Sequence, residues 1–291
     1  MGVRHLIVVV NKMDDDAVDF SEDRFKEIRG RILPKLQQLG YNPMHVVVVP
    51  ISGLKNDNIA YPSQAMSWYD GHPLLGALDS LKQPRRLVTK PLRVPIQNVR
   101  YVEGEGTWVD GCVETGSVES EEVRFSPSGI QMTFRSVEEN HEALPMSDLG
   151  AGKILSFLFG GKLDDQIFPG QVMSDTKSPA AQEVSGFEAQ IIVVNHPGEI
   201  SVGYTPIIDV HTAHTPCTLV GIKKSMDRRT GKLKELNPTS VREGDACIVE
   251  LQPQKPVSLE RFADFPPLGR FVVRDGQRIV GVGVVKSVKY N

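Results

Sequence analysis

Two uninterrupted apolar runs near the amino terminus constrain the fold of this chain more than any other feature. The runs are LIVVV at 6–10 and VVVVPI at 46–51, and neither alternates with polar residues. Such runs are typical of strands in a parallel sheet that is covered on both faces. Between them, apolar residues recur at the three- and four-residue spacing of one helical face: Phe25, Ile28, Ile32, Leu36 and Leu39. The pattern predicts a strand, a helix and a second parallel strand joined by a right-handed crossover.

The predicted helix has recognisable ends. Ser21 is a candidate N-cap, followed by two acidic residues in the first turn, and Gly40 is the candidate terminator. Pro34 falls inside the pattern and predicts a kink. Two strands are too few for a stable sheet of this kind, so we expect the first part of the chain to be the end of a domain that begins elsewhere.

From about Val88 the pattern changes to short alternating strands separated by turn residues, which is typical of β-barrels or sandwiches. A polar, proline-containing stretch from Asp175 to Ser185 is the candidate linker between two such regions. The predicted fold is an α/β remnant of a larger domain at 1–87, followed by two antiparallel β-barrels at 88–183 and 184–291.

Composition excludes several functional classes. With 40% hydrophobic and 24% charged residues and a formal net charge of -3, the chain is an ordinary globular protein without the bulk positive field of a nucleic-acid binder. Cys112, Cys217 and Cys247 are widely spaced, which predicts a reducing compartment, no disulfide framework and no metal site. No apolar run approaches the roughly 20 residues of a membrane span, so we expect a cytoplasmic protein without membrane contact.

Polar residues follow both apolar runs at the point where each predicted strand ends. Asn11-Lys12-Met13-Asp14 follows the first run and Ser52-Gly53-Leu54 the second. Ligands of open α/β sheets bind at the carboxyl ends of the strands. The first stretch resembles the NKxD element by which GTPases select guanine, and the second resembles their other guanine-contacting loop. The resemblance implies that Asp14 accepts hydrogen bonds from the N1–H and 2-amino groups of guanine, while a backbone N–H near Ser52 donates to O6.

Adenine lacks both of these donors and would leave the Asp14 carboxylate unpaired, a mismatch that reaches about 10⁴-fold in discrimination. Lys12 would lay its aliphatic stem along the base, and Asn11 would tie the two loops together. The alternative is that Asp14 to Asp16 form a solvated acidic turn.

The phosphate-binding part of a GTP site is not recognisable in the sequence. The nearest match to GxxxxGK[ST] is the stretch from Asp148 to Ile154, where Ser147 replaces the first glycine and Ile154 replaces Ser/Thr. We interpret this stretch as a turn in a barrel. No DxxG element lies near the amino terminus either. We therefore expect that these 291 residues alone do not hydrolyse GTP.

The order of these elements resembles translational GTPases, and later stretches resemble elongation factor 1-alpha. They are FEAQIIVVNHPGEISVGYTPIIDVHTAH (187–214), DRRTGK (227–232), FPPLGRFVVRD (265–275) and VGVGVVKSV (280–288). The resemblance implies a partial sequence that starts inside the nucleotide-binding domain of a GTPase. It also implies GTP/GDP as cofactor, with Mg²⁺ in the intact protein. The implied partners are aminoacyl-tRNA, the ribosome, a guanine-nucleotide exchange factor and actin.

Two departures from elongation factor 1-alpha point to a sister group. Cys112 stands where that family carries arginine, and residues 156–170 diverge. Both differences resemble the elongation factor-like proteins. That family does the same work, the GTP-dependent delivery of aminoacyl-tRNA to the ribosomal A site.

The resemblance also implies tRNA-contacting residues. Glu138 matches a glutamate that lies against the terminal adenine of tRNA in elongation factor Tu, and His141 takes the place of a nearby basic residue. The loop from Arg274 to Arg278 resembles the one that meets the T-stem, with Gly276 allowing close approach. In this comparison Arg274 and Arg278 would contact phosphates, and His211 with Thr212 forms a second candidate surface.

Several alternatives stay open at this point. Glu138 and Glu139 could be a solvated strand edge, and the basic cluster from Lys223 to Lys232 could be a solvated hairpin tip. His211 and His214 would face opposite ways on a strand, which argues against a zinc site. The alternative functions are a termination or ribosome-rescue GTPase that binds a tRNA-shaped protein, and a non-catalytic module that binds actin or RNA.

Overall fold

The computed structural model describes residues 5–38, 41–81, 86–227 and 231–291. The chain divides into two compact units, 1–85 and 86–291. Some predicted features lie outside the described residues. They are Met1, the helix position Leu39, the helix terminator Gly40, and part of both the DRRTGK stretch and the basic cluster between Lys223 and Lys232. The two units are described separately below.

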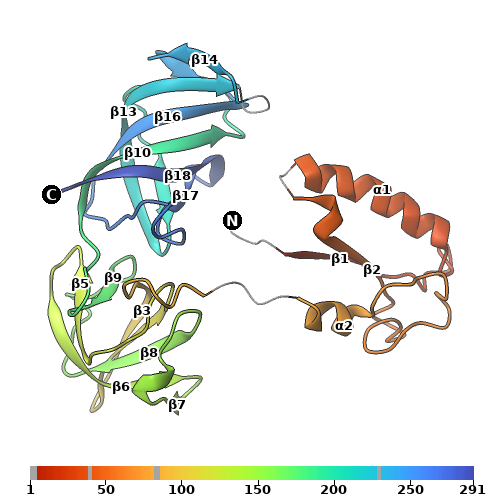
Figure 1. The fold of residues 1–291 in the computed structure, drawn as a ribbon, viewed down its shortest axis with the longest axis horizontal. Helices are drawn as coiled ribbons and strands as arrows, with labels where there is room; N and C mark the ends of the chain where they lie inside the picture. The colour runs from red at the N-terminus through yellow and green to blue at the C-terminus, as the bar shows by residue number, and fades with distance from the viewer. Residues whose placement is uncertain (1–4, 39–40, 82–85, 228–230) are drawn as a thin grey trace. The chain divides into compact units, whose positions relative to one another are not determined.

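The first unit contains the predicted crossover. Strands β1 (Leu6–Val10) and β2 (Val46–Pro50) pair in parallel, from Leu6 beside Val46 to Val10 beside Pro50. Helix α1 (Glu22–Gln38) connects them and lies along the pair (Figure 1). A 3-10 helix, η1 (Pro43–His45), precedes β2, and a short helix, α2 (Leu74–Asp79), ends the unit.

Helix α1 begins as the sequence predicts. The Ser21 hydroxyl accepts a hydrogen bond from the Arg24 backbone N–H at 3.3 Å, and Pro34 lies inside the helix. Phe25 is buried against Trp68, with ring centroids 5.3 Å apart. Trp68 donates through Nε1 to the Phe20 carbonyl at 3.0 Å, so this tryptophan is a core residue.

The two faces of the β1–β2 pair are covered unequally, which differs from the prediction of two covered faces. Val10 and Val48 pack in the core that contains Phe25 of α1. The opposite face has only a small cluster around Val49, and Val9 and Val47 remain 39% and 37% exposed. Short α2 is the only helix of the described residues that contributes to that cluster, and it is too small to cover both strands.

The second unit contains two antiparallel sheets that each close on themselves, which confirms the predicted barrels. In the first barrel the order is β5-β9-β3-β4-β8-β6-β7, and β5 also pairs with β6. Its strands are β3 (Val94–Val102), β4 (Gly106–Cys112), β5 (Glu122–Ser126), β6 (Gln131–Glu139), β7 (Glu142–Ala143), β8 (Ile154–Phe159) and β9 (Val172–Asp175). Phe125, Phe157 and Phe159 are fully buried in its core.

In the second barrel the order is β12-β17-β18-β10-β16-β13-β14, and β12 also pairs with β13. Its strands are β10 (Val184–Val193), β12 (Ile207–Val210), β13 (Ala213–Asp227), β14 (Leu233–Leu236), β16 (Asp245–Pro253), β17 (Arg270–Asp275) and β18 (Arg278–Tyr290). Strands β11 (Ile200–Ser201) and β15 (Ser240–Val241) form a separate small ladder. The Phe271 ring lies over Gly283, where a Cβ would approach it to 2.4 Å.

Two stretches singled out in the sequence have simple structural roles. The P-loop-like stretch begins in the 3-10 helix η2 (Met146–Asp148), continues as a turn and enters β8 at Ile154, so it is a barrel turn as predicted. The candidate linker lies between β9 and β10. It is fixed by a hydrogen bond from the Ala181 N–H to the Ser174 hydroxyl at 3.0 Å and by one from Arg93 Nη1 to the Pro179 carbonyl at 2.8 Å. The division of the chain at 87 and 183 stays a prediction.

Candidate functional site

The loops that follow β1 and β2 are joined by a side chain. Asn11 Oδ1 accepts a hydrogen bond from the Gly53 backbone N–H at 2.9 Å and a second from the Lys12 N–H at 2.7 Å. The Met13 N–H also donates to the Ile51 carbonyl at 3.2 Å. Because of these contacts, the two polar loops form a single surface at the carboxyl ends of the strands.

The second loop is shaped by its own hydrogen bonds. Ser52 is completely buried, and its backbone exchanges two hydrogen bonds with Asp57. Its hydroxyl accepts from the Lys55 N–H at 3.0 Å. Asn58, also buried, donates to the Pro50 carbonyl at 2.8 Å and holds the end of the loop to β2. Asn58 was not recognised in the sequence, where it is one of several polar residues in a turn.

The Asp14 carboxylate points to the second loop. A hydrogen bond from the Ser52 side chain lowers the pKa of Asp14, against a smaller opposing effect of burial, and the nearby Lys55 charge lowers it further. Asp14 is therefore ionised at neutral pH. A carboxylate in that state accepts hydrogen bonds and donates none, which suits two adjacent N–H groups.

Each of the two loops carries an exposed side chain. Leu54 is 88% exposed, which is unusual for a large apolar residue. Lys12 is also exposed and adopts a positive φ of 62°. Lys55 places its ammonium 5.2 Å from the centroid of the Phe20 ring. Together these groups supply apolar surface and a carboxylate acceptor at the edge of the sheet.

The first barrel places Glu138 and His141 together at one hairpin. Glu138 lies at the end of β6 opposite Ala143, and the turn to β7 contains His141 with a φ of 67°. His141 is exposed, whereas neighbouring Glu139 is paired with Lys153 at 3.1 Å. The structure thus brings the two predicted residues to one hairpin, with half-buried Glu138 in β6 and exposed His141 in the turn.

His211 and Thr212 lie in the turn between β12 and β13, which corrects the assumption that this segment is a continuous strand. His211 has a φ of 40°, and its Nε2 is 3.0 Å from the Ser258 carbonyl. Burial lowers its pKa to about 4, against the opposing effect of the Ser258 hydrogen bond. A neutral, internally bonded histidine is poorly suited to the RNA contact expected of it. His214 has a different partner, Asp209, at 2.7 Å.

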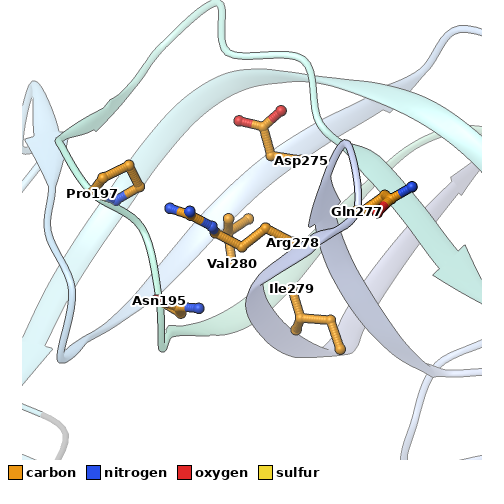
Figure 2. Close-up of a pocket in the computed structure, with 7 residues that line it drawn as sticks. All are labelled: Asn195, Pro197, Asp275, Gln277, Arg278, Ile279 and Val280. Carbon is orange, nitrogen blue, oxygen red and sulfur yellow. The ribbon is translucent and has the colours of Figure 1, made fainter.

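Arg274, which is expected to contact phosphate, is paired within the second barrel. Its Nε and Nη2 donate to the two carboxylate oxygens of Asp209 at 2.8 and 3.1 Å. Gly276 and Arg278 are exposed in the following turn, and Gly276 has a φ of 55°. Figure 2 shows Arg278 lining an open pocket with Asn195 and Pro197. Asp209 was missed in the sequence because its partner is distant along the chain.

Comparison with known proteins identifies the family of this chain. The family model described as GTP-eEF1A C-terminal domain-like matches residues 186–286. Elongation factor 1-alpha from Eimeria bovis is 42% identical over 99% of this chain and 84% of its own length. The chain belongs to the elongation factor 1-alpha family.

Other members of the elongation factor 1-alpha family extend the match. The Tetrahymena pyriformis protein is 42% identical over 99% of this chain, and elongation factor 1-alpha 1 from Euplotes crassus is 43% identical over the same share. The chain spans 66% and 65% of their lengths. The narrower assignment to the elongation factor-like group stays a prediction.

A solved structure has the same fold. The crystal structure of Sup35 complexed with GDP matches with a TM-score of 0.63 and 29% identity, covering 99% of this chain and 70% of that one. Sup35 complexed with GMPPNP gives the same values. In the chain described here, no helix of the described residues has the length and apolar character needed to cross a membrane.

Proposed function

We propose that the intact factor binds GTP through the two loops joined by Asn11 and Gly53, and delivers aminoacyl-tRNA to the ribosomal A site. Membership of a translation elongation factor family supports this proposal. The observation that carries it is the hydrogen bond from the Gly53 backbone N–H to Asn11 Oδ1, which joins the loop of Asp14 to the loop of Ser52 at the carboxyl ends of β1 and β2.

In this proposal each residue has a defined part in base recognition. Asp14 accepts hydrogen bonds from N1–H and the 2-amino group of guanine, and a backbone N–H of the Ser52–Gly53 segment donates to O6. Lys12 and Leu54 cover the two faces of the ring. An adenine amine in place of O6 would meet another donor, so the same loops reject ATP.

The remaining chemistry belongs to the intact factor. GTP hydrolysis requires a phosphate-binding loop and side chains that hold Mg²⁺, and no matching motif occurs in the 291 residues. When Mg²⁺ is bound, it neutralises charge on the phosphates. Hydrolysis then releases the tRNA after the codon has been matched.

The tRNA would contact both barrels. The exposed hairpin with Glu138 and His141 is the proposed site for the 3′ end, because single-stranded RNA ends are recognised through stacking and edge hydrogen bonds. Gly276 and Arg278 are the proposed contacts to the duplex backbone. The ribosome and a guanine-nucleotide exchange factor are the further partners in this proposal, with actin as an additional partner and the cytoplasm as the compartment.

Retention of tRNA by the GTP-loaded intact factor tests this function. We expect charged tRNA to be retained, and uncharged tRNA to be retained less. Asp14→Ala should abolish retention in GTP, because it removes the group that reads the base. Retention of a release-factor protein in place of charged tRNA would favour the termination GTPase. Co-sedimentation with actin filaments without any tRNA binding would favour the non-catalytic module.

A further inference from the structure

The turn between β17 and β18 is held by side chains from outside it. Arg274, at its start, uses all three guanidinium nitrogens. Nε and Nη2 donate to Asp209, and Nη1 donates to the Gly276 carbonyl at 2.9 Å. Since β12 and β17 are paired, with Asp209 beside Val272, the carboxylate comes from the adjacent strand. The arginine therefore links β12 to the turn.

Asp209 is well suited to this role. Burial raises its pKa, but the hydrogen bonds from Arg274 and His214 outweigh burial, and the pKa lies below its usual value. The carboxylate thus stays ionised at neutral pH and offers both oxygens to a planar guanidinium, which is the strong bidentate arrangement. The positive charge of Arg274 is matched at the same place by a negative charge.

A second side chain holds the next residue of the turn. The Tyr204 hydroxyl donates to Asp275 Oδ2 at 3.1 Å. The Tyr204 ring packs against the core of the second barrel, and burial with the nearby Asp275 charge raises its pKa to about 12. The phenol therefore remains a hydrogen-bond donor at neutral pH.

Arg278, at the end of the turn, has a different environment. It is exposed, and within the part of the chain that the structure describes it forms no ion pair with a carboxylate. Figure 2 shows its side chain extending over the pocket toward Pro197, with Asp275 on the other side. Of the two arginines in this turn, Arg278 is the one that offers its charge to solvent.

We propose that Asp209 and Tyr204 are positioning residues that preform this turn for an RNA backbone, and that Arg278 rather than Arg274 supplies the charge that meets phosphate. The inference rests on the proposed function, in which the turn contacts the tRNA duplex. A turn that is ordered before binding loses less conformational entropy on contact, so its supporting residues contribute to affinity without touching RNA.

Salt dependence separates these two roles. Binding of a short RNA hairpin to the 291-residue chain is measured over a series of KCl concentrations for the wild type and four variants. Arg278→Gln should reduce the slope of log affinity against log salt by about one, because one phosphate contact is lost. Asp209→Asn, Tyr204→Phe and Arg274→Gln should each weaken binding with the slope unchanged. The double variant Asp209→Asn/Arg274→Gln should be no weaker than either single variant.

The opposite results overturn the proposal. A reduced slope for Arg274→Gln, or tighter binding with a steeper slope for Asp209→Asn, would identify Arg274 as the phosphate contact. Failure of the wild-type 291-residue chain to bind the hairpin would remove the RNA role of the turn. The proposed function would fail only if the GTP-loaded intact factor also retained no charged tRNA.

Hydrogen exchange tests the positioning itself without RNA. The Gly276 amide should exchange faster in Asp209→Asn and Tyr204→Phe than in the wild type, while Arg278→Gln leaves it unchanged. Both positioning substitutions are nearly isosteric at partly exposed side chains, and unchanged thermal unfolding shows that the barrel is intact. Exchange at the wild-type rate in both variants would show that neither residue holds the turn.

Discussion

Arg93 Nη2 lies 2.8 Å from Glu260 Oε1, and the two side chains, 3% and 9% exposed, form an ion pair buried between the two barrels. Arg93 Nε donates to the same oxygen at 2.9 Å, and Nη1 donates to the Leu92 and Pro179 carbonyls. The guanidinium carbon is also 4.7 Å from the centroid of the Phe265 ring. The charge of each partner is therefore compensated by the other across the junction.

Removing one partner of this pair should destabilise the barrels strongly. Arg93→Met leaves the Glu260 carboxylate buried without its counter-charge, and such changes cost about 3–5 kcal/mol. Urea unfolding of the chain, followed by circular dichroism, measures the cost. The double variant Arg93→Met/Glu260→Leu should recover most of the loss, and a loss of stability in the double variant equal to the sum of the two single losses would contradict this account.

Base specificity should change with Asp14→Asn. The asparagine amide can donate to the 2-oxo group of xanthine, which occupies the place of guanine's 2-amino group. We expect the intact factor carrying this substitution to lose affinity for GTP and to gain affinity for XTP. Competition between the two nucleotides for a fluorescent analogue measures the change. Retention of the wild-type preference for GTP would show that Asp14 does not read the base.

His211 should make the protein sensitive to mild acid. Its pKa is lowered from 6.5 to about 4 in the folded state, so between these values the unfolded chain binds a proton that the folded chain does not. The contribution of the neutral ring to the free energy of unfolding is fully present above pH 6.5 and decreases as the pH falls toward 4.

Urea unfolding at a series of pH values measures this effect. His211→Gln keeps a donor for the Ser258 carbonyl but does not titrate, so its stability should decrease less over the same interval. A wild type and variant with parallel pH profiles would assign the acid sensitivity to other groups.

The 291-residue chain should bind GTP weakly and hydrolyse none. In the proposed complex the loops around Asp14 and Ser52 would contact only the base, and most affinity for a nucleoside triphosphate comes from a loop that cradles the phosphates. Titration with mant-GTP and an assay for released phosphate measure both properties. Saturable binding in the micromolar range would contradict the expectation.

Local patterns predicted the elements of the first unit because each depends on neighbouring residues. Ser21 is a helix cap because its hydroxyl reaches an amide three residues away, and the two polar loops meet because parallel strands end at one edge. The exposure of Val9 and Val47 was not predictable in this way, since it depends on which segments cover the sheet.

The surroundings of His211 and Arg274 in the second barrel could not be predicted, for a different reason. His211 occupies a turn without glycine, proline or asparagine, so nothing in its neighbourhood interrupts the expected strand. The role of Arg274 is decided by Asp209, a residue 65 positions away, and strand pairing of that kind cannot be read from spacing. The tRNA surfaces that the sequence suggests stay predictions, and the ion pairs of their charged residues became known only from the three-dimensional arrangement.

The incompletely covered pair of β1 and β2 has a practical consequence for handling this chain. Val9 and Val47 present apolar surface beside strand edges that bind no further strand in the described part of the chain. Such edges are templates for other strands. Self-association at high concentration is therefore expected to begin at the first unit, and light scattering should decrease when Val9 is replaced by lysine.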